Sequence, residues 1–269
     1  NELLRLKYRY LDLRRPAMQK NLIMRHKIAF VAREYFDEQN FLEIETPILT
    51  KSTPEGARDY LVPSRVHPGK FYALPQSPQL FKQLLMLAGY DRYFQIARCF
   101  RDEDLRADRQ PDFTQIDIEM SFVEDVDVQS VNEGFLQRLF KETLNVDIQL
   151  PLPRLKYEEA MARYGSDKPD TRFGLELVDL TDIFKKSEFS VFQNALAAGG
   201  SIRAVNAKGA SADFSRKELD AMGEFVKTYR AKGLIWMNDK ADGLASPVLK
   251  FLSEDEIAAV RKAANFEQG

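Results

Sequence analysis

The sequence predicts an α+β fold with an antiparallel strand pair and a second, smaller α+β unit. The first observation is a pair of strand-like segments, residues 93–100 and 113–122, which enclose a charged loop and therefore form a hairpin longer than a tight turn. The second is a set of segments with apolar residues at helical spacing, such as residues 19–40 and 125–144. The third is a proline-flanked connection near residues 150–153, where the texture of the sequence changes.

The first half of the chain contains both helices and strands. A basic, aromatic segment at 5–15 is ended by Pro16, and we expect a long amphipathic helix over residues 19–40. The alternation in FLEIETPIL, residues 41–49, predicts a strand, which Pro47 confines to an edge or a terminus. The other expected elements are a long functional loop over 51–70 with a short strand at 60–62, a short strand at 71–74, and a helix over 79–89 that ends at a glycine.

The second half divides into a connection and a separate unit. We predict domains at 1–150 and 171–269, joined by residues 151–170, which hold a short helix at 157–164 and the turn GSDKPD. Within 171–269 we expect the aromatic residues, Trp236 included, to lie in the core. Strand-like and helical segments alternate there: VDLTDIF, SIRAVNA, a helix at 215–231, GLIWMN, and a helix at 254–264.

Composition excludes several classes of function. The formal net charge is −2, so an RNA partner would have to meet a local basic patch. One cysteine rules out an intramolecular disulfide and a cysteine-cluster zinc site, and two distant histidines leave little material for a Ser-His-Asp triad. No apolar run approaches the roughly 20 residues that span a bilayer. We therefore expect a cytoplasmic protein without membrane contact, and the start at Asn1 rather than Met suggests a piece of a longer chain.

The residues that point to chemistry are concentrated between Phe100 and Phe122, in FRDEDLRADRQPDFTQIDIEMSF. A strand that ends in Arg101 and a returning strand that bears Gln115 and Asp117 place a guanidinium among acidic and amide groups. Such an arginine can bind a phosphate or a carboxylate with two parallel hydrogen bonds. From these residues alone, a hairpin with solvated charges is an equally good interpretation.

This string resembles motif 2 of the class II aminoacyl-tRNA synthetases, and its sequence is similar to that of the bacterial aspartyl enzymes in particular. The segment ending FLEIETPIL resembles motif 1, the dimer interface of that class, and TPEGARDYLVPSR and LPQSPQLFKQ resemble the substrate-recognition segments. The resemblance implies a class II synthetase-type antiparallel sheet flanked by helices, incomplete in this chain. Residues 171–269 resemble, more weakly, the inserted domain of the bacterial aspartyl enzymes, which an archaeal glutamyl-tRNA amidotransferase subunit shares.

The resemblance also implies roles for single residues at the nucleotide. Arg101 would be catalytic, since it would bridge the substrate carboxylate and the α-phosphate as the adenylate forms. Asp102, Glu103 and Gln110 would contact ATP, and Phe113 would stack on the adenine. For Phe113 taken alone, a strand residue in the core is the simpler interpretation.

The amino-acid pocket follows from the same resemblance. Lys82, which shares a helix face with Gln79, would pair with the side-chain carboxylate of aspartate, although a lone lysine on a helix is more often solvated. An amide substrate would leave this ammonium without a charged partner. The pocket would be completed by Glu55, Ser77, Arg101, Gln115 and Asp117, and the acceptor end of the tRNA would meet Arg106 and Arg109.

The implied activity is that of an aspartate–tRNA ligase, which uses ATP and L-aspartate, charges tRNA(Asp) and works as a homodimer. An anticodon-binding OB-fold domain, motif 3 and the ligands of Mg²⁺ would lie outside this chain, so we expect no metal ligands within it and no adenylation by the isolated 269 residues. A non-catalytic, synthetase-like RNA-binding module is the alternative, and Lys82 argues against an asparaginyl or lysyl enzyme.

Overall fold

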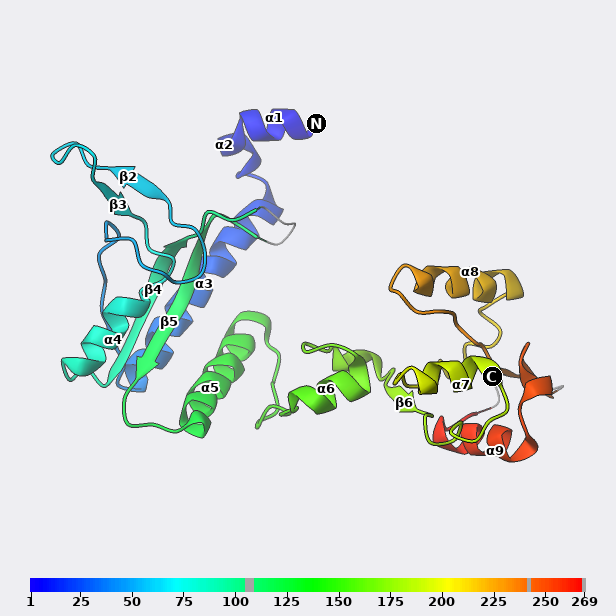
Figure 1. The fold of residues 1–269 in the computed structure, drawn as a ribbon. Helices are drawn as coiled ribbons and strands as arrows, with labels where there is room; N and C mark the ends of the chain where they lie inside the picture. The colour runs from blue at the N-terminus through cyan, green and yellow to red at the C-terminus, as the bar shows by residue number, and fades with distance from the viewer. Residues whose placement is uncertain (105–108, 241–242, 268–269) are drawn as a thin grey trace. The chain divides into compact units, whose positions relative to one another are not determined.

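A computed structural model describes residues 1–104, 109–240 and 243–267 of the chain (Figure 1). The chain divides into two compact units, Asn1–Pro153 and Arg154–Gly269. Each unit has an apolar cluster of its own, and each is described separately below. Among the described residues, no helix is both long and apolar enough to cross a bilayer.

The first unit is built on a three-stranded sheet in the order β1-β4-β5. Strands β4 (Arg92–Phe100) and β5 (Asp112–Met120) pair antiparallel over their full length, as the hairpin pattern predicted. Strand β1 (Leu42–Glu43) pairs parallel with the start of β4. The sheet is thus mainly one long hairpin, and it agrees with the predicted α+β class.

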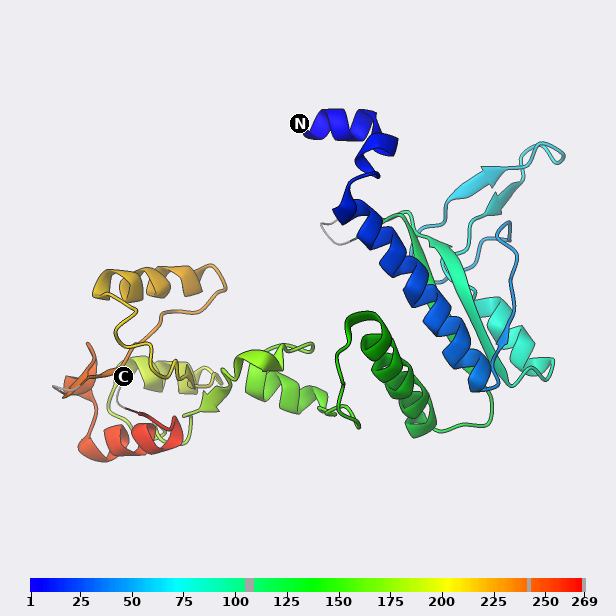
Figure 2. The same ribbon diagram turned by 180° about the vertical axis from the view of Figure 1, so that it is seen from behind.

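Helices cover both faces of this sheet. Helices α3 (Pro16–Glu38) and α5 (Asp125–Leu144) contribute to one apolar cluster, in which Phe36, Phe94 and Phe135 are buried. Helix α4 (Gln79–Leu87) contacts β4 and β5 from the opposite side. Figure 2, which views the unit from behind, shows α3 crossing in front of the strands and α4 beyond them. The sheet therefore has one face for the core and one face for α4.

A close contact sets how α3 packs on α5. The Tyr35 hydroxyl donates to the carbonyl oxygen of Val131 at 2.9 Å and lies over Gly134. A Cβ added at Gly134 would overlap the tyrosine hydroxyl, so the absence of a side chain there permits the approach.

The N-terminal segment forms two short helices, α1 (Glu2–Lys7) and α2 (Arg9–Asp12), before α3. Asp12 is buried and forms ion pairs with Arg5, Arg9 and Arg15, and these bonds hold the segment in its bend. Helix α3 begins at Pro16, three residues earlier than the predicted start, because proline is well suited to the first position of a helix.

The prediction of a strand over residues 41–49 was largely wrong. Only Leu42 and Glu43 belong to a strand, and the last backbone hydrogen bond to β4 is from the Ile44 amide to the Phe94 carbonyl oxygen at 3.1 Å. Beyond it, Pro47 has no amide hydrogen to offer. The chain leaves β4 and reaches the hairpin of β2 (Leu61–Pro63) and β3 (Phe71–Ala73). A hollow of about 270 Å³ opens beside β4 at this point, lined by residues that include Arg33, Glu43, Thr46, Gln95 and Arg98.

The second unit has its own apolar core around Phe184, Phe192 and Val260. Its sheets are two-stranded pairs, β6 with β7 and β8 with β9. The elements are helices α6 (Tyr157–Tyr164), α7 (Ser190–Ala197), α8 (Arg216–Lys227) and α9 (Glu254–Ala263), 3-10 turns η1 (Thr171–Phe173) and η2 (Leu249–Phe251), and strands β6 (Leu177–Asp179), β7 (Arg203–Val205), β8 (Asn238–Lys240) and β9 (Gly243–Ala245).

Several predictions for the second unit need correction. Residues 233–237 of GLIWMN do not form a strand, and β8 begins only at its last residue, Asn238. Ile235 and Met237 nevertheless pack against the apolar core. Strand β6 takes only the start of VDLTDIF, and helix α7 was not predicted. Phe225, on α8, and Tyr229, just after that helix, are exposed rather than in the core, at 60% and 72%. Trp236 is only partly buried.

Candidate functional site

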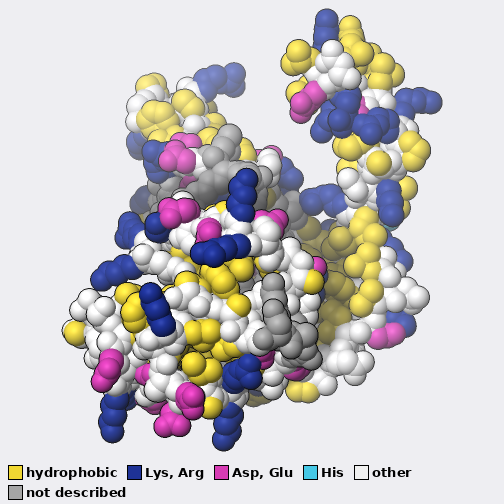
Figure 3. Space-filling view, turned by 90° about the vertical axis from the view of Figure 1, so that its right-hand side faces the viewer, with side chains coloured by type: hydrophobic (Ala, Val, Ile, Leu, Met, Phe, Trp, Pro, Cys, Tyr) yellow, Lys and Arg dark blue, Asp and Glu magenta, His cyan; other side chains and the backbone are white. Residues whose placement is uncertain are grey.

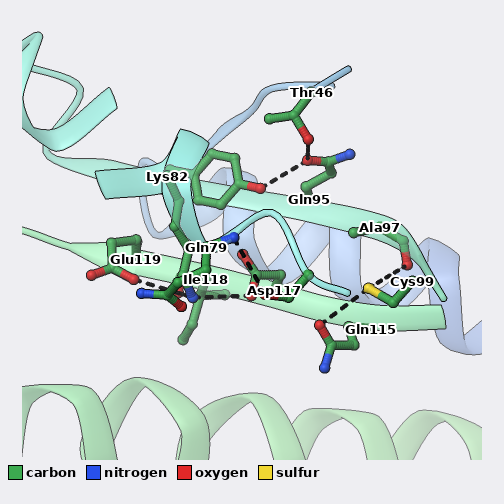
Figure 4. A network of polar contacts seen from close by, with 12 residues as sticks. Thr46, Gln79, Lys82, Gln95, Ala97, Cys99, Gln115, Asp117, Ile118 and Glu119 are labelled. Atoms are coloured by element: carbon green, nitrogen blue, oxygen red, sulfur yellow. Dashed lines mark hydrogen bonds and ion pairs between the residues drawn. The ribbon is translucent and has the colours of Figure 1, made fainter. Parts of the chain in front are cut away.

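The two faces of the β4–β5 hairpin carry different residues because side chains alternate along a strand. Phe94, Ile116 and Ile118 belong to the apolar cluster with α3 and α5. The opposite face pairs Gln95 with Asp117, Ala97 with Gln115 and Cys99 with Phe113. Figure 4 shows this polar face, with α4 above it. The residues predicted from the hairpin therefore share one surface.

Lys82 is buried in this surface, at 9% exposure. Its Nζ lies 3.0 Å from Asp117 Oδ1 and 3.2 Å from Glu119 Oε2, and it donates to the Ile118 carbonyl oxygen at 3.3 Å. The interpretation of Lys82 as a solvated surface residue is thus wrong. The ammonium is held between two carboxylates of the chain itself, in a cluster with a net negative charge.

Burial and pairing oppose each other in the lysine–carboxylate cluster of Lys82, Asp117 and Glu119. Burial acts to lower the pKa of Lys82, but its bonds to Asp117 and Glu119 outweigh this and raise it, so the ammonium stays charged. Burial raises the pKa of Asp117, although Lys82 acts in the other direction. The Asp117 Oδ2 atom is buried and has no hydrogen-bond partner among the described residues. It is therefore an acceptor with spare capacity.

Glu55 lies next to the start of α4. One of its carboxylate oxygens accepts from the Ser77 hydroxyl at 2.8 Å, and the other accepts from the Thr53 hydroxyl at 3.1 Å. The Ser77 hydroxyl also accepts from the backbone amide of Gln79 at 3.3 Å. Figure 4 places Gln79 on the same side of the strands as Lys82 and Asp117. The predicted pocket residues Glu55, Ser77 and Gln79 are thus contiguous with one another.

Arg101 lies at the other end of this face, beside an open hollow of about 320 Å³. Its guanidinium carbon is 5.0 Å from the centre of the Phe113 ring, within range of a cation–π contact. Phe113 is therefore a wall of the hollow rather than a core residue. The lining residues are Arg101, Glu103, Asp104, Arg109, Gln110, Pro111 and Phe113.

Two residues predicted near the nucleotide or tRNA have other contacts. Among the described residues, the lining of the hollow does not include Asp102, whose amide donates to the Arg58 carbonyl oxygen at 3.0 Å. Arg109, predicted to contact tRNA, lines the hollow and pairs with Glu103 at 2.7 Å. Arg106 lies outside the described residues.

Cys99 lies opposite Phe113 on this face, between the lysine–carboxylate cluster and the hollow beside Arg101. Its thiol is fully buried and donates to Gln115 Oε1 at 3.3 Å. Burial raises the pKa of the Cys99 thiol to about 11, with a further rise from the charge of Asp117, a decrease from that of Arg101 and a rise from that of Glu55. The Cys99 thiol therefore stays protonated at neutral pH, as a neutral donor on this face of the hairpin.

The arrangement suits a ligand with two different ends. The hollow offers the Arg101 cation and an aromatic face, which fit a phosphate and a base. The lysine–carboxylate cluster offers a cation and a spare carboxylate oxygen, which fit a carboxylate and an ammonium group. The described part of the chain has no group of three or more His, Cys, Asp or Glu side chains that could hold a metal ion.

Some residues of the site were not singled out from the sequence. Glu119 continues the alternation of Gln115 and Asp117, so strand periodicity could have identified it. Gln95 accepts from Thr46 at 2.9 Å and from Tyr93 at 2.8 Å, and no motif marked these contacts. Gln76 lies in a turn and is 2% exposed, which sequence alone does not indicate.

Comparison with protein families gives a match over residues 1–257 to the class II tRNA synthetases of the D, K and N type. The chain belongs to this family. The match agrees with the four motif resemblances in the sequence. Class II synthetase membership by itself does not separate aspartyl, lysyl and asparaginyl enzymes, since the family includes all three.

Among curated relatives of this class II synthetase, the aspartate–tRNA ligase of Ruminiclostridium cellulolyticum is 65% identical over 270 residues, which is 100% of the chain and 45% of the relative. The aspartate–tRNA(Asp/Asn) ligase of Caldanaerobacter subterraneus subsp. tengcongensis is 62% identical over 269 residues, again 100% and 45%. The chain thus spans about half the length of the curated relatives it matches. A solved asparaginyl-tRNA synthetase from Pyrococcus horikoshii is 24% identical, with a TM-score of 0.49 over 54% of this chain and 33% of that one.

Proposed function

We propose that the protein acts as an aspartate–tRNA ligase, which activates L-aspartate with ATP as aspartyl-adenylate and then transfers the aspartyl group to the 3′-terminal ribose of a tRNA, with AMP as the leaving group. The names of the curated relatives support the aspartate assignment. The observation that carries the proposal is the common face on which Arg101 and the lysine–carboxylate cluster lie, with Cys99 between them along β4. Such a face can hold the two ends of an aminoacyl-adenylate at once.

In the first reaction, an oxygen of the aspartate α-carboxylate attacks the α-phosphorus of ATP, and pyrophosphate leaves with the electrons of the broken P–O bond. The enzyme contributes position and charge, with no covalent intermediate on the protein. Arg101 would bind the attacking carboxylate and the α-phosphate together, because its planar guanidinium can serve both anions. This is the catalytic role assigned to it from the sequence.

The amino-acid pocket would select a second carboxylate. Lys82 would bind the side-chain carboxylate of aspartate with Gln79 beside it, and Asp117 would receive the α-ammonium group with Glu55, Ser77 and Gln115. The spare Oδ2 atom of Asp117 supports its role, since an ammonium would give this atom a donor. Lys82 is already paired with Asp117 and Glu119, so an aspartate carboxylate would have to join or replace one of these bonds.

The nucleotide would occupy the hollow beside Arg101. Phe113 would stack on the adenine, while Glu103 and Gln110 would orient the nucleotide. Asp102, next to Arg101, would contact ATP from the end of the strand. Mg²⁺ would arrive with ATP and neutralise phosphate charge. Since the described residues offer no cluster for a metal ion, we assign no step of this chain to it.

The tRNA would approach from the loop between β4 and β5, where Arg106 and Arg109 were predicted to contact it. Arg109 pairs with Glu103, so a phosphate would compete with that carboxylate for the guanidinium. The names of the relatives include both tRNA(Asp) ligases and tRNA(Asp/Asn) ligases. We propose tRNA(Asp) as the partner, with the asparagine tRNA as a second substrate to be tested.

A homodimer would bury exposed apolar residues of α3. Leu22, Ile23 and Phe30 are 53%, 66% and 53% exposed, which is unusual for a long helix beside a core. In Figure 3 the N-terminal segment, at the upper right, adds exposed apolar side chains beside Lys and Arg side chains. These faces support the predicted interface at motif 1.

The domain assignments are part of the same proposal. Residues 1–150 would be the first part of the catalytic domain, 151–170 the connection and 171–269 the inserted domain. The isolated 269 residues would not form the adenylate, since β5 has a described neighbour on one edge only and the relatives are about twice as long.

The test is amino-acid-dependent exchange of pyrophosphate into ATP by the full gene product, with aspartate, asparagine and lysine compared. We expect exchange with aspartate alone, and Lys82→Met should lower kcat/KM for aspartate by about a hundredfold, because Asp117 and Glu119 then lack their cation. Equal exchange with asparagine or lysine would contradict the aspartate assignment. No exchange by a folded protein that still binds tRNA would favour the non-catalytic RNA-binding module.

A further inference from the structure

One buried side chain holds the loop that carries Glu55. Gln76 is 2% exposed and lies in the turn between β3 and α4. Its amide nitrogen donates to the Ala57 carbonyl oxygen at 2.9 Å and to Asp59 Oδ1 at 2.5 Å, and its carbonyl oxygen accepts from the Ala57 amide at 3.0 Å. The loop is thus bound to Gln76 much as a neighbouring strand would be.

These bonds need an amide side chain. Gln76 donates and accepts at the same time, which a carboxylate cannot do when ionised and a methionine cannot do at all. The site is closed to water, so a lost partner there is not replaced. A glutamate at this position would also face the Asp59 carboxylate, whose pKa is lowered because bonds from Ser52 and Gln76 outweigh the effect of burial.

The held loop extends from the amino-acid pocket to the nucleotide end of the site. At one end Glu55 accepts from Ser77, the residue that follows Gln76. At the other end, Asp102 donates to the Arg58 carbonyl oxygen at 3.0 Å, and Arg58 Nε donates back to the Asp102 carbonyl oxygen at 3.1 Å. Gly56, at φ +108°, makes the turn between Glu55 and Ala57.

We propose that Gln76 is a positioning residue, which fixes residues 53–59 so that the Glu55 carboxylate stands at the amino-acid pocket. The inference rests on the proposed aspartate activation, because Glu55 has its role there. Gln76 itself is too deeply buried to touch a substrate. It acts through the loop, and its loss raises the KM for aspartate more than it changes the KM for ATP.

The experiment compares Gln76→Glu and the double variant Gln76→Glu/Asp59→Asn with the unchanged full gene product. We expect Gln76→Glu to raise the KM for aspartate by about tenfold, with the KM for ATP changed by less than about threefold. In the double variant an amide at position 59 can donate to the carboxylate at position 76, so part of the aspartate affinity returns. Gln137→Glu is the matched control, because its amide also donates to a backbone carbonyl but lies exposed on α5.

Hydrogen exchange of the same variants separates the inference from the proposed function. In Gln76→Glu the amides of residues 53–59 should lose protection while those of β4 and β5 keep it. A loosened loop with an unchanged aspartate KM overturns the positioning role, and so does a loop that keeps its protection. If the unchanged protein shows no aspartate-dependent exchange of pyrophosphate into ATP, the proposed function is wrong. Amide protection of residues 53–59 alone then decides whether Gln76 holds the loop.

Discussion

The two faces of the β4–β5 hairpin differ in what they require of their residues, although the same strands supply both. The face toward α3 and α5 packs the buried Phe94 and the partly buried Ile116 and Ile118 into the apolar cluster, and these side chains need only the right volume. The face toward α4 buries the lysine–carboxylate cluster, in which every group depends on a charged neighbour. The first face stabilises the fold, and the second carries the proposed site, where Asp117 Oδ2 has no hydrogen-bond partner among the described residues. Variants on each face test this division of roles.

The largest effect on stability should come from the core face. Phe36 is 1% exposed and contacts the rings of Phe41, Phe94 and Phe135. Phe36→Ala should lower the free energy of unfolding of the first unit by about 3–5 kcal/mol, from lost burial and the cavity left behind. This change in the free energy of unfolding is measured by urea titration, with hydrogen exchange of the amides in β4 and β5 as the probe. Phe122→Ala, at a residue 96% exposed, should change it by less than about 0.5 kcal/mol.

The polar face should show a smaller loss of stability together with a large loss of aspartate recognition. Lys82→Met leaves Asp117 and Glu119 without their buried cation and should lower the free energy of unfolding by about 3 kcal/mol. Adding Asp117→Asn should recover part of that stability, because one unpaired charge is removed, without restoring aspartate binding. If the double variant bound aspartate like the unchanged protein, this face would have no special role in recognition.

A third variant tests the packing behind the core face. Gly134→Ala places a methyl group on the Tyr35 hydroxyl and should lower the free energy of unfolding by about 1–3 kcal/mol. Gly223→Ala is the matched control, since it also replaces a helical glycine, and its Cβ meets no described atom within 4 Å. That substitution should stabilise α8 by about 0.5–1 kcal/mol. Equal effects at both positions, measured by thermal unfolding, would argue against the Tyr35 contact.

The smallest effect should be local and depend on pH. Bonds from Arg5 hold the pKa of Asp12 down against the effect of burial, at about 2 rather than 3.8. A lowered pKa in the folded state means that the stabilisation is present above the ordinary value and is lost as the pH falls toward 2. The protection factors of the amides in α1 and α2, which correct for the pH dependence of intrinsic exchange, should therefore fall over this range before those in β4 and β5. Asp12→Asn should show fast exchange in α1 and α2 at neutral pH.

Sequence reasoning succeeded where the pattern is local. The hairpin and helix α5 follow from periodicity, and the alternation along β5 is enough to place Gln115 and Asp117 on one face. The hollow beside Arg101 contains four of the five residues predicted at the nucleotide. Family resemblance supplied the roles of these residues, since spacing alone left solvated charges as an equal interpretation.

The sequence could not show contacts that depend on tertiary packing. Lys82 and Asp117 are 35 positions apart, and only the placement of α4 over β5 brings them within 3.0 Å. The strand expected at 41–49 ended early because pairing with β4 stopped after Ile44, which periodicity does not reveal. Gln76 was overlooked because its importance lies in two bonding partners on another loop.

Calorimetric titration of the full gene product with a non-hydrolysable aspartyl-adenylate analogue tests the central claim most directly. The claim is that Arg101 joins the amino-acid pocket to the nucleotide hollow. We expect the analogue to bind. Arg101→Ala should raise its dissociation constant about a hundredfold, which is a loss of about 2.7 kcal/mol of binding free energy. Undiminished binding by a folded Arg101→Ala variant would mean that the two ends of the site do not meet at this arginine.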